Sequence, residues 1–426
     1  MLRKFTFFIF LISVLAINNL YSQFLSPVNP IANQVIPNTN IDFSWNMHPD
    51  ATVYHITIAS NNDLTAIIYE DDVVINNKNY TITGQDTCYW NIVAFNGLEP
   101  VMLSDTFMFV IFTPLTFPGI QVWLNGDDVE ADGNNKVATW TDKSDNANSF
   151  AQDDDSKKPI LITNGLNDLP ALQFDGNDFL SGGDILDIGN ASSWSLFVVG
   201  KSNASEGTFI AKSLAAGVPN RWALFYEGGS LTFLLSDQNG QAFPFAAALS
   251  QYHLTTIHAN RTGQNLKYRI DGVLKTSNNS ISSNTYNLDS PYRCLLGGYS
   301  NGSDNGEIYY LNGNISELII YSSLSEDQSL FVENMLRYKY YPTLYKEPVS
   351  LGFDILIADN FCDTTLDAGI GFSDYLWSTG ETTQTISVNQ KGYYSVTATD
   401  SYGVTSSDII YVSYPEIGYS FADTTI

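Results

Sequence analysis

Residues 311–342 read LNGNISELIIYSSLSEDQSLFVENMLRYKYYP, an apolar run that passes directly into a helical pattern. Residues 318–321, LIIY, predict a buried strand. Ser325 then predicts a helix N-cap, and Gln328, three residues later, completes a capping box. We expect this helix to plug one edge of a β-sandwich. Its predicted apolar face consists of Leu330, Phe331, Met335 and Tyr338, before Pro342 ends the segment.

The rest of the chain has almost no helical periodicity. Short alternating runs, such as residues 54–58 (YHITI), are bounded by clusters of Asn, Asp, Gly and Ser. Alternation of this kind places successive side chains on opposite faces of a strand, and many short strands are typical of sandwiches and barrels. The predicted fold class is therefore all-β, with multidomain β-sandwiches and one short closing helix.

The charge of the chain is strongly acidic. It has 45 Asp and Glu residues against 19 Lys and Arg residues, which gives a net charge of −26 over 426 residues. Such a surface repels phosphate backbones and anionic lipid, so we expect no nucleic-acid partner. An acidic surface of this kind also attracts divalent cations.

The N-terminus predicts export. Residues 1–23 form a signal peptide with a basic start at Arg3 and Lys4 and an apolar stretch over residues 5–17. No later stretch reaches the roughly 18 apolar residues that a membrane span needs. We therefore expect a secreted or cell-surface protein without a transmembrane segment. An uncleaved N-terminal anchor remains the alternative.

The cysteines and prolines indicate separate modules. Pro114 and Pro118 frame one joint, and residues 342–348 frame another. The three cysteines, Cys88, Cys294 and Cys362, then fall in three different modules, and none has a partner within its own. We expect no disulfide to be needed for folding.

Residues 24–113 resemble a fibronectin type III or related immunoglobulin-like module. The resemblance rests on FSWNMHPDATVYHITIAS and TCYWNIVAFN, in which Trp45 lies on an early predicted strand, Tyr54 on the next and Trp90 on a late one. Large aromatic residues at that spacing fill the space between two sheets.

Residues 349–414 resemble the immunoglobulin-like or polycystic-kidney-disease-like repeats of bacterial surface proteins, on the stretch TTLDAGIGFSDYLWSTGETTQTISVNQKGYYSVTATDSYG. The final residues, 415–426, repeat the pattern of residues 354–369 and look like the start of a further repeat that breaks off. We therefore expect a fragment of a longer repeat protein or a truncated product.

Residues 115–345 resemble the laminin-G-like, concanavalin A-like jelly rolls of secreted bacterial proteins. Four stretches carry the resemblance in order: the opening GIQVWLNGDDVEADGNNKVATWTDKSDNANSFAQ, then LPALQFDGNDFL, YRIDGVL and the closing strand–helix step. The resemblance implies a central jelly roll that recognises carbohydrate or protein, and a calcium ion at a loop rim. Similar architectures also use the type IX secretion route, so a missing C-terminus would carry the contact with secretion or surface-anchoring machinery.

The stretch PALQFDGNDFL (residues 170–180) is the first candidate site. Gly176-Asn177 between Asp175 and Asp178 fits a two-residue hairpin turn, at whose tip water would keep both carboxylates ionised. Calcium favours carboxylate, Asn and backbone oxygens in flexible geometry. Two interpretations stay open, a bare turn or a calcium site made by Asp175, Asn177 and Asp178. The nearby acidic loops, at residues 127–128, 142–145 and 153–155, are further candidates.

Catalytic motifs are not found. The nearest approach to a glycosidase carboxylate pair is Glu130-Ala131-Asp132, which lies among Gly and Asn residues and so reads as a loop. There is no nucleophile elbow and no zinc-binding helix. We expect a binding or adhesion protein. A divergent polysaccharide-degrading glycosidase or lyase and a purely structural stalk remain the alternatives.

Aromatic residues of the central domain are the candidate ligand contacts. They would stack on sugar rings if they lie exposed near a sheet end, whereas buried ones would serve core packing. The four candidates are Trp222, Tyr226, Tyr299 and Tyr309.

Overall fold

A computed structural model describes residues 25, 27–30, 34–36, 40–84, 87–213, 220–236, 241–278, 280–281, 283–300, 307–352, 355–357 and 363–413. The described residues form seven β-sheets and a single α-helix, so the all-β prediction is confirmed. The chain divides into two compact units, Met1–Gln34 with Thr39–Val110 and Val35–Asn38 with Ile111–Ile426. The predicted signal peptide and the segment 415–426 lie outside the described residues, and among those described no helix is long and apolar enough to cross a membrane.

The first unit is built on two sheets with an aromatic core between them. Trp45 and Trp90 are fully buried, with ring centroids 6.3 Å apart, and Tyr54 lies 5.6 Å from Trp45. The predicted aromatic filling is therefore confirmed. The strands of this part of the chain are β1 (Pro27–Asn29), β2 (Gln34–Ile36), β3 (Asn40–Trp45), β4 (Val53–Ala59), β5 (Ile67–Val73), β6 (Asn77–Thr81), β7 (Thr87–Asn96), β8 (Glu99–Leu103) and β9 (Phe107–Ile111).

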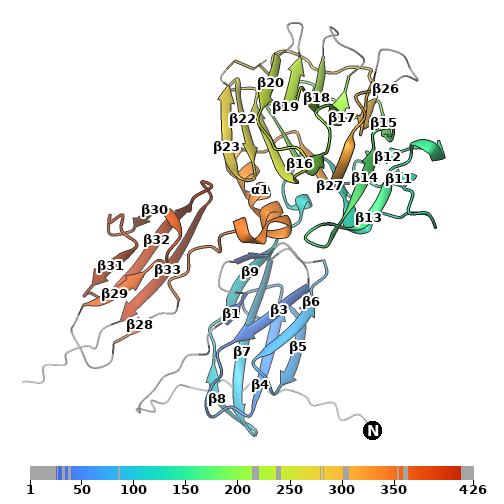
Figure 1. Ribbon diagram of the computed structural model, residues 1–426. Helices are drawn as coiled ribbons and strands as arrows, with labels where there is room; N and C mark the ends of the chain where they lie inside the picture. Colours follow the sequence, from blue (N-terminus) through green and yellow to red (C-terminus); the bar gives the residue numbers. More distant parts are fainter. Residues whose placement is uncertain are drawn as a thin grey trace, which may run out of the picture. The chain divides into compact units, whose positions relative to one another are not determined.

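The central sandwich consists of two eight-stranded antiparallel sheets, drawn from green to orange in Figure 1. The first sheet has the order β13-β14-β27-β16-β21-β22-β23, and β10 also pairs with β27. Its strands are β10 (Ile120–Asn125), β13 (Ile160–Leu166), β14 (Leu169–Asp175), β16 (Ser193–Ser202), β21 (His253–Asn260), β22 (Asn265–Ile270), β23 (Val273–Asn278) and β27 (Asn312–Tyr321).

The second sheet of the sandwich has the order β11-β12-β15-β24-β17-β18-β19-β20. Side chains from both sheets meet in one large hydrophobic core, to which alternate residues of most strands contribute. Its strands are β11 (Thr139–Trp140), β12 (Phe150–Ala151), β15 (Leu180–Gly183), β17 (Gly207–Lys212), β18 (Arg221–Glu227), β19 (Ser230–Ser236), β20 (Gln241–Phe245) and β24 (Cys294–Leu296). The short pair β25 (Tyr299–Ser300) and β26 (Glu307–Ile308) follows β24.

Helix α1 (Glu326–Tyr340) begins where the sequence predicts. Ser325 Oγ accepts a hydrogen bond from the Gln328 amide, and the Ser325 amide donates one to Gln328 Oε1, which completes the capping box. The predicted position on an edge of the sandwich is wrong. The helix packs on the outward face of the first sheet, in a second core with residues of β16, β21 and β27. Its buried apolar residues are Val332, Met335, Leu336 and Tyr340, while Phe331 packs against Phe112 and Phe117.

The C-terminal module, residues 349–413, is a smaller two-sheet sandwich. One sheet has the order β28-β33-β32-β30 and the other pairs β29 with β31. Val396 and Ala398 point into its core and Tyr394 packs against it, as the alternation predicts. Its strands are β28 (Ile355–Leu356), β29 (Thr364–Asp367), β30 (Phe372–Trp377), β31 (Thr385–Val388), β32 (Gly392–Asp400) and β33 (Thr405–Ser413).

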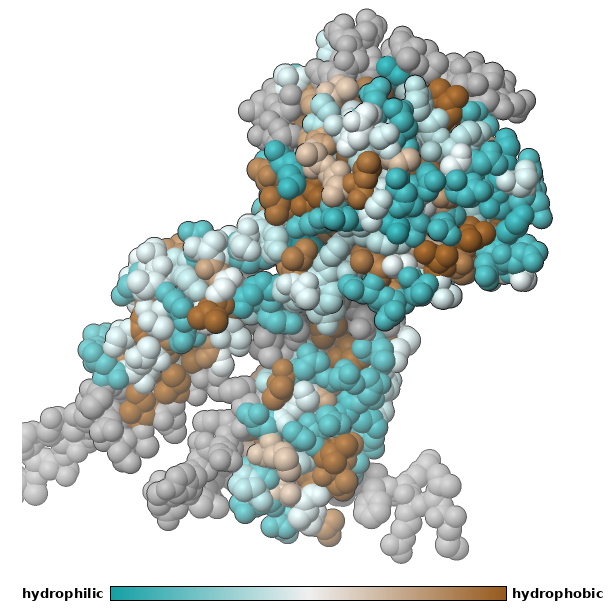
Figure 2. Space-filling model, in the orientation of Figure 1, coloured by the Kyte–Doolittle hydropathy of each residue, from teal (hydrophilic) through white to brown (hydrophobic). Residues whose placement is uncertain are grey.

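Short 3-10 turns complete the described structure: η1 (Pro114–Thr116), η2 (Gly126–Asp128), η3 (Asp155–Lys157) and η4 (Pro342–Leu344). The molecular surface agrees with the acidic composition. On the face in view in Figure 2, hydrophilic residues predominate and hydrophobic ones gather in small separate patches.

Candidate functional site

The candidate loop at residues 170–180 is a crossing between the two sheets of the sandwich. β14 pairs with β13 and β27 in the first sheet, whereas β15 pairs with β12 and β24 in the second. The predicted hairpin is therefore wrong. Phe174 and Phe179, on either side of the loop, are both buried. Gly176, with φ of +95°, makes the turn, and its amide donates to the Leu311 carbonyl at 3.0 Å.

Asp178 is buried, which contradicts the expected solvated tip. The residue is 5% exposed, and its Oδ2 accepts a hydrogen bond from the Asp175 amide at 2.9 Å. Burial raises the pKa of the Asp178 carboxyl to about 6, and the nearby Asp175 carboxylate adds to the shift. The prediction that water keeps both carboxylates near their ordinary pKa values is wrong for Asp178.

The three proposed calcium ligands are engaged in hydrogen bonds within the loop or to the neighbouring loop at Ser156. Asp175 Oδ1 accepts from the Asn177 amide at 2.8 Å, and Asn177 Nδ2 donates to the Ser156 carbonyl at 3.2 Å. Over the described part of the chain, no three His, Cys, Asp or Glu side chains are grouped so that they could hold a metal ion. The side chains as placed do not make a calcium cage, and calcium binding here stays a prediction.

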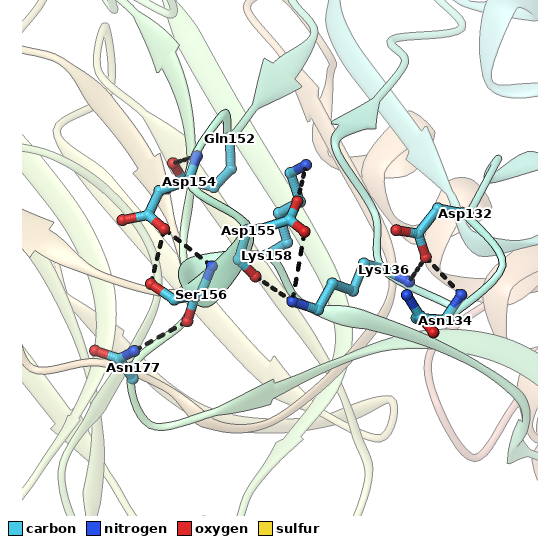
Figure 3. A network of polar contacts seen from close by, with 9 residues as sticks. All are labelled: Asp132, Asn134, Lys136, Gln152, Asp154, Asp155, Ser156, Lys158 and Asn177. Carbon is cyan, nitrogen blue, oxygen red and sulfur yellow. Dashed lines mark hydrogen bonds and ion pairs between the residues drawn. The ribbon is translucent and has the colours of Figure 1, made fainter.

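Lysines pair with the neighbouring acidic loops (Figure 3). Asp155 lies 2.5 Å from Lys158 Nζ and 3.9 Å from Lys136 Nζ. Asp154 Oδ1 instead accepts from the Ser156 amide at 2.9 Å, which is a local turn bond. Asp132 Oδ1 accepts from the Lys136 amide at 2.9 Å. The loops at 132 and 153–155 are therefore held together by internal ion pairs and turn bonds, which need no metal.

The structure divides the four predicted aromatic contacts into two pairs, of which the first lies on β18. Trp222 and Tyr226 point into the hydrophobic core between the sheets, and each is only 1% exposed. Neither ring offers a face to a ligand in this arrangement, so their burial agrees with core packing. Arg221, Ala223 and Phe225 alternate with them and lie on the outward side of the second sheet.

Tyr299 and Tyr309 meet on that outward side. Their ring centroids are 6.2 Å apart in an edge-to-face arrangement, and Phe225 packs against the Tyr299 ring at the same distance. The Tyr299 hydroxyl oxygen accepts hydrogen bonds from Ser213 Oγ at 2.7 Å and from Arg221 at 3.0 Å. We call these five residues (Ser213, Arg221, Phe225, Tyr299 and Tyr309) the outer aromatic cluster.

Tyr309 is the exposed member of the outer aromatic cluster. Tyr299 is 6% exposed, whereas Tyr309 is 49% exposed and so meets the condition set for a stacking residue. The backbone of Tyr309 has φ of +51°, which is a costly conformation for a bulky side chain. The Thr208 amide holds it there by donating to the Tyr309 carbonyl at 2.9 Å. Strain of this kind is concentrated at functional sites.

Three members of the cluster were missed from sequence: Ser213, Arg221 and Phe225. The signal that would have found two of them is the alternation of RWALFYE, residues 221–227. Once Trp222 and Tyr226 are assigned to the core, Arg221 and Phe225 must face outward. Ser213 carries no local signal, because it meets Tyr299 only through pairing of strands distant in sequence.

A serine–histidine pair within the first sheet offers no nucleophile. Ser195 Oγ lies 2.9 Å from His258 Nδ1, but Ser195 is fully buried. Burial lowers the pKa of His258 to about 4, so the imidazole is neutral at physiological pH. The contact therefore gives each of these two buried polar side chains a hydrogen-bond partner.

Comparison with known proteins gives likenesses to solved structures. No protein-family model and no curated protein matches the chain. Domain 4 of AbnA, an extracellular GH43 arabinanase of Geobacillus stearothermophilus solved with arabinotriose, is 18% identical over 50% of this chain and 98% of its own, with a TM-score of 0.35.

Two further structures extend the comparison. The CBM40 of the Ruminococcus gnavus IT-sialidase, bound to α2,3-sialyllactose, is 13% identical over 34% of this chain and 83% of its own, with a TM-score of 0.28. The binding domain of botulinum neurotoxin serotype D is 16% identical over 70% of this chain and 62% of its own, with a TM-score of 0.35. At these identities and TM-scores, no residue role or ligand is transferred to this chain.

Proposed function

We propose that this protein is an exported binding protein of the cell surface or extracellular space, whose central sandwich recognises carbohydrate through the outer aromatic cluster. The observation that carries the proposal is the exposed Tyr309 ring, held edge-to-face on Tyr299 beside the Arg221 guanidinium. A flat apolar ring next to fixed polar groups suits a sugar, which presents C–H faces and hydroxyl edges.

Each member of the cluster has a distinct part in this proposal. The half-exposed Tyr309 ring provides the stacking face. Tyr299 is fixed by Ser213 and Arg221, whose hydrogen bonds both end on its hydroxyl oxygen, so the Tyr299 hydroxyl proton remains to be donated to a ligand oxygen. Because these side chains are already ordered, they would lose little conformational entropy when a ligand binds.

The test is a glycan-array screen of the full chain, followed by titration of the best ligand. Loss of an aromatic contact of this kind costs about 1 kcal/mol, so Tyr309→Ala should weaken binding by about fivefold or more. The matched control is Tyr286→Ala, since Tyr286 is 57% exposed on another loop of the same sandwich. If both variants bind equally well, the outer aromatic cluster is not the site.

The proposal assigns binding without catalysis. It is supported by the missing catalytic motifs and by the buried position of Ser195. Release of reducing ends from a panel of polysaccharides by the full chain would contradict it and favour the glycosidase or lyase alternative. Calcium dependence is part of the same proposal, and running the array with calcium and with a chelator tests it.

A further inference from the structure

Helix α1 carries two charged residues that are completely buried. Glu333 and Arg337 are both 0% exposed, on the side of the helix that also holds Asn334. Arg337 donates to Asn334 Oδ1 at 3.0 Å, but the Arg337 Nε and one terminal nitrogen have no hydrogen-bond partner among the described residues. Buried charges are costly unless opposite charges lie close. Glu333 supplies one such charge for Arg337, but the nearby Arg269 adds a second positive charge, so a further negative group is needed.

A turn of the C-terminal module supplies that compensation. Asp400 is buried, and its Oδ2 lies 3.9 Å from the Arg337 guanidinium. The Tyr402 ring lies against the same guanidinium, 4.0 Å from ring centroid to its central carbon, in a cation–π contact. Arg269, on β22, donates to the Tyr402 carbonyl at 3.1 Å.

The turn has hydrogen bonds of its own. Asp400 Oδ1 accepts hydrogen bonds from the amides of Tyr402 and Val404, both at 2.8 Å. Gly403, with φ of +85°, allows the chain to reverse there. Asp400 thus holds the turn through Oδ1 and faces Arg337 with Oδ2, so loss of the docked contact would also loosen the two amide hydrogen bonds.

We propose that residues 400–403, Asp-Ser-Tyr-Gly, are a docking turn for which Arg269 and Arg337 form the receptor. The C-terminal module is thereby fixed to the central sandwich, and it does not move independently on the linker at residues 342–348. Without the turn, Arg269, Arg337 and Glu333 would be left with a net positive charge, and Arg337 would lose the Tyr402 ring face, which is why the docked state is favoured.

Gly272 offers a clean way to test the docking. It lies in the β22–β23 turn with φ of +82°, and a Cβ there would approach the Tyr402 ring to 2.6 Å. Gly229, in the β18–β19 turn, has φ of +80° and no atom within 4 Å of its would-be Cβ. Gly272→Ala and Gly229→Ala thus impose the same backbone strain, but only the first collides with the docking turn.

The experiment measures hydrogen exchange at the Tyr402 and Val404 amides in the full chain. We expect exchange at least tenfold faster in Gly272→Ala and unchanged in Gly229→Ala. Tyr402→Leu, corrected for its intrinsic rate, should speed exchange at Val404 to a similar extent, and combining it with Gly272→Ala should add little, because both release the same contact. Equal rates in the two glycine variants, or an unchanged rate in Tyr402→Leu, would overturn the proposal.

Discussion

Replacement of Asp178 by Asn isolates the energetic cost of one buried carboxyl group. An asparagine Oδ1 can still accept the hydrogen bond that the Asp175 amide donates to Asp178 at 2.9 Å. The substitution therefore keeps the shape and the hydrogen bond of the crossing loop, removes the charge and replaces the other carboxyl oxygen by an NH2 group. Asp178→Asn should stabilise the protein at neutral pH.

The size and sign follow from the shift in pKa. Burial raises the pKa of Asp178 from 3.8 to about 6, so the folded state holds this proton to a higher pH than the unfolded chain does. The native state loses stability as pH rises through this interval, and the loss is complete above about pH 6. At about 1.36 kcal/mol per pKa unit the full shift is worth about 3 kcal/mol, and solvent near a surface loop reduces the expected gain to about 1–3 kcal/mol.

Denaturant unfolding of the full chain at several pH values measures this gain. The stability difference between variant and wild type should be near zero at about pH 3.5 and reach its plateau above about pH 6. Asp153→Asn is the control, because it removes the same charge from an exposed position of a neighbouring loop. A gain that does not vary with pH, or an equal gain in Asp153→Asn, would refute the burial argument.

The same variant separates a bare loop from a calcium site. A ligand that binds only the native state raises the melting temperature by mass action. If calcium stabilises the wild type and Asp178→Asn abolishes that response, the loop binds calcium despite its internal hydrogen bonds. Without a calcium response in either protein, the loop serves only to join the two sheets.

Two further predictions concern ionisation and redox state. Burial lowers the pKa of His253, but the Asp271 carboxylate, 2.8 Å from its Nδ1, outweighs this and places the pKa above its usual value. The pair therefore stabilises the fold fully below about pH 6.5 and loses its effect as pH rises through the raised pKa, so His253→Gln should cost more stability at about pH 5.5 than at about pH 9. A pH-independent cost would exclude this pair as the cause. Cys88 and Cys294 are buried, and Cys362 lies outside the described residues. Because the three cysteines fall in separate modules, reductant should leave the melting temperature unchanged, whereas a fall of many degrees would indicate a bridge.

Signals confined to a few residues predicted local structure well. The capping box at Ser325 and Gln328 needs only four consecutive residues, and the helix starts where it was expected. The alternation of β32 likewise placed Val396 and Ala398 in a core. The buried helix face was predicted less well, because Arg337 and Glu333 are polar residues whose burial depends on charges brought by β22 and by the C-terminal module.

The candidate site depended on which strands pair, and local patterns do not contain that information. The aromatic composition of the central domain pointed equally to Tyr299 and Tyr309 and to Trp222 and Tyr226 of β18. Only the order of the second sheet decides that β18 turns Trp222 and Tyr226 inward while Tyr299 reaches Arg221 on the opposite side. The aromatic composition of a strand therefore indicates a core or a site equally well until its neighbours are known.

The crossing loop is the clearest example of a structure that local sequence patterns do not predict. An Asp-Gly-Asn-Asp step between two apolar runs fits a hairpin, in which β14 would pair with the strand that follows it. In the structure β14 pairs instead with β27, nearly 140 residues further along the chain, and the next strand joins the other sheet. Because the loop then passes over the edge of the core, Asp178 turns inward, where its carboxyl loses water and its pKa rises. The perturbed acid is thus a consequence of long-range strand pairing, and the Asp178→Asn measurement tests the burial that the observed crossing imposes on this carboxyl.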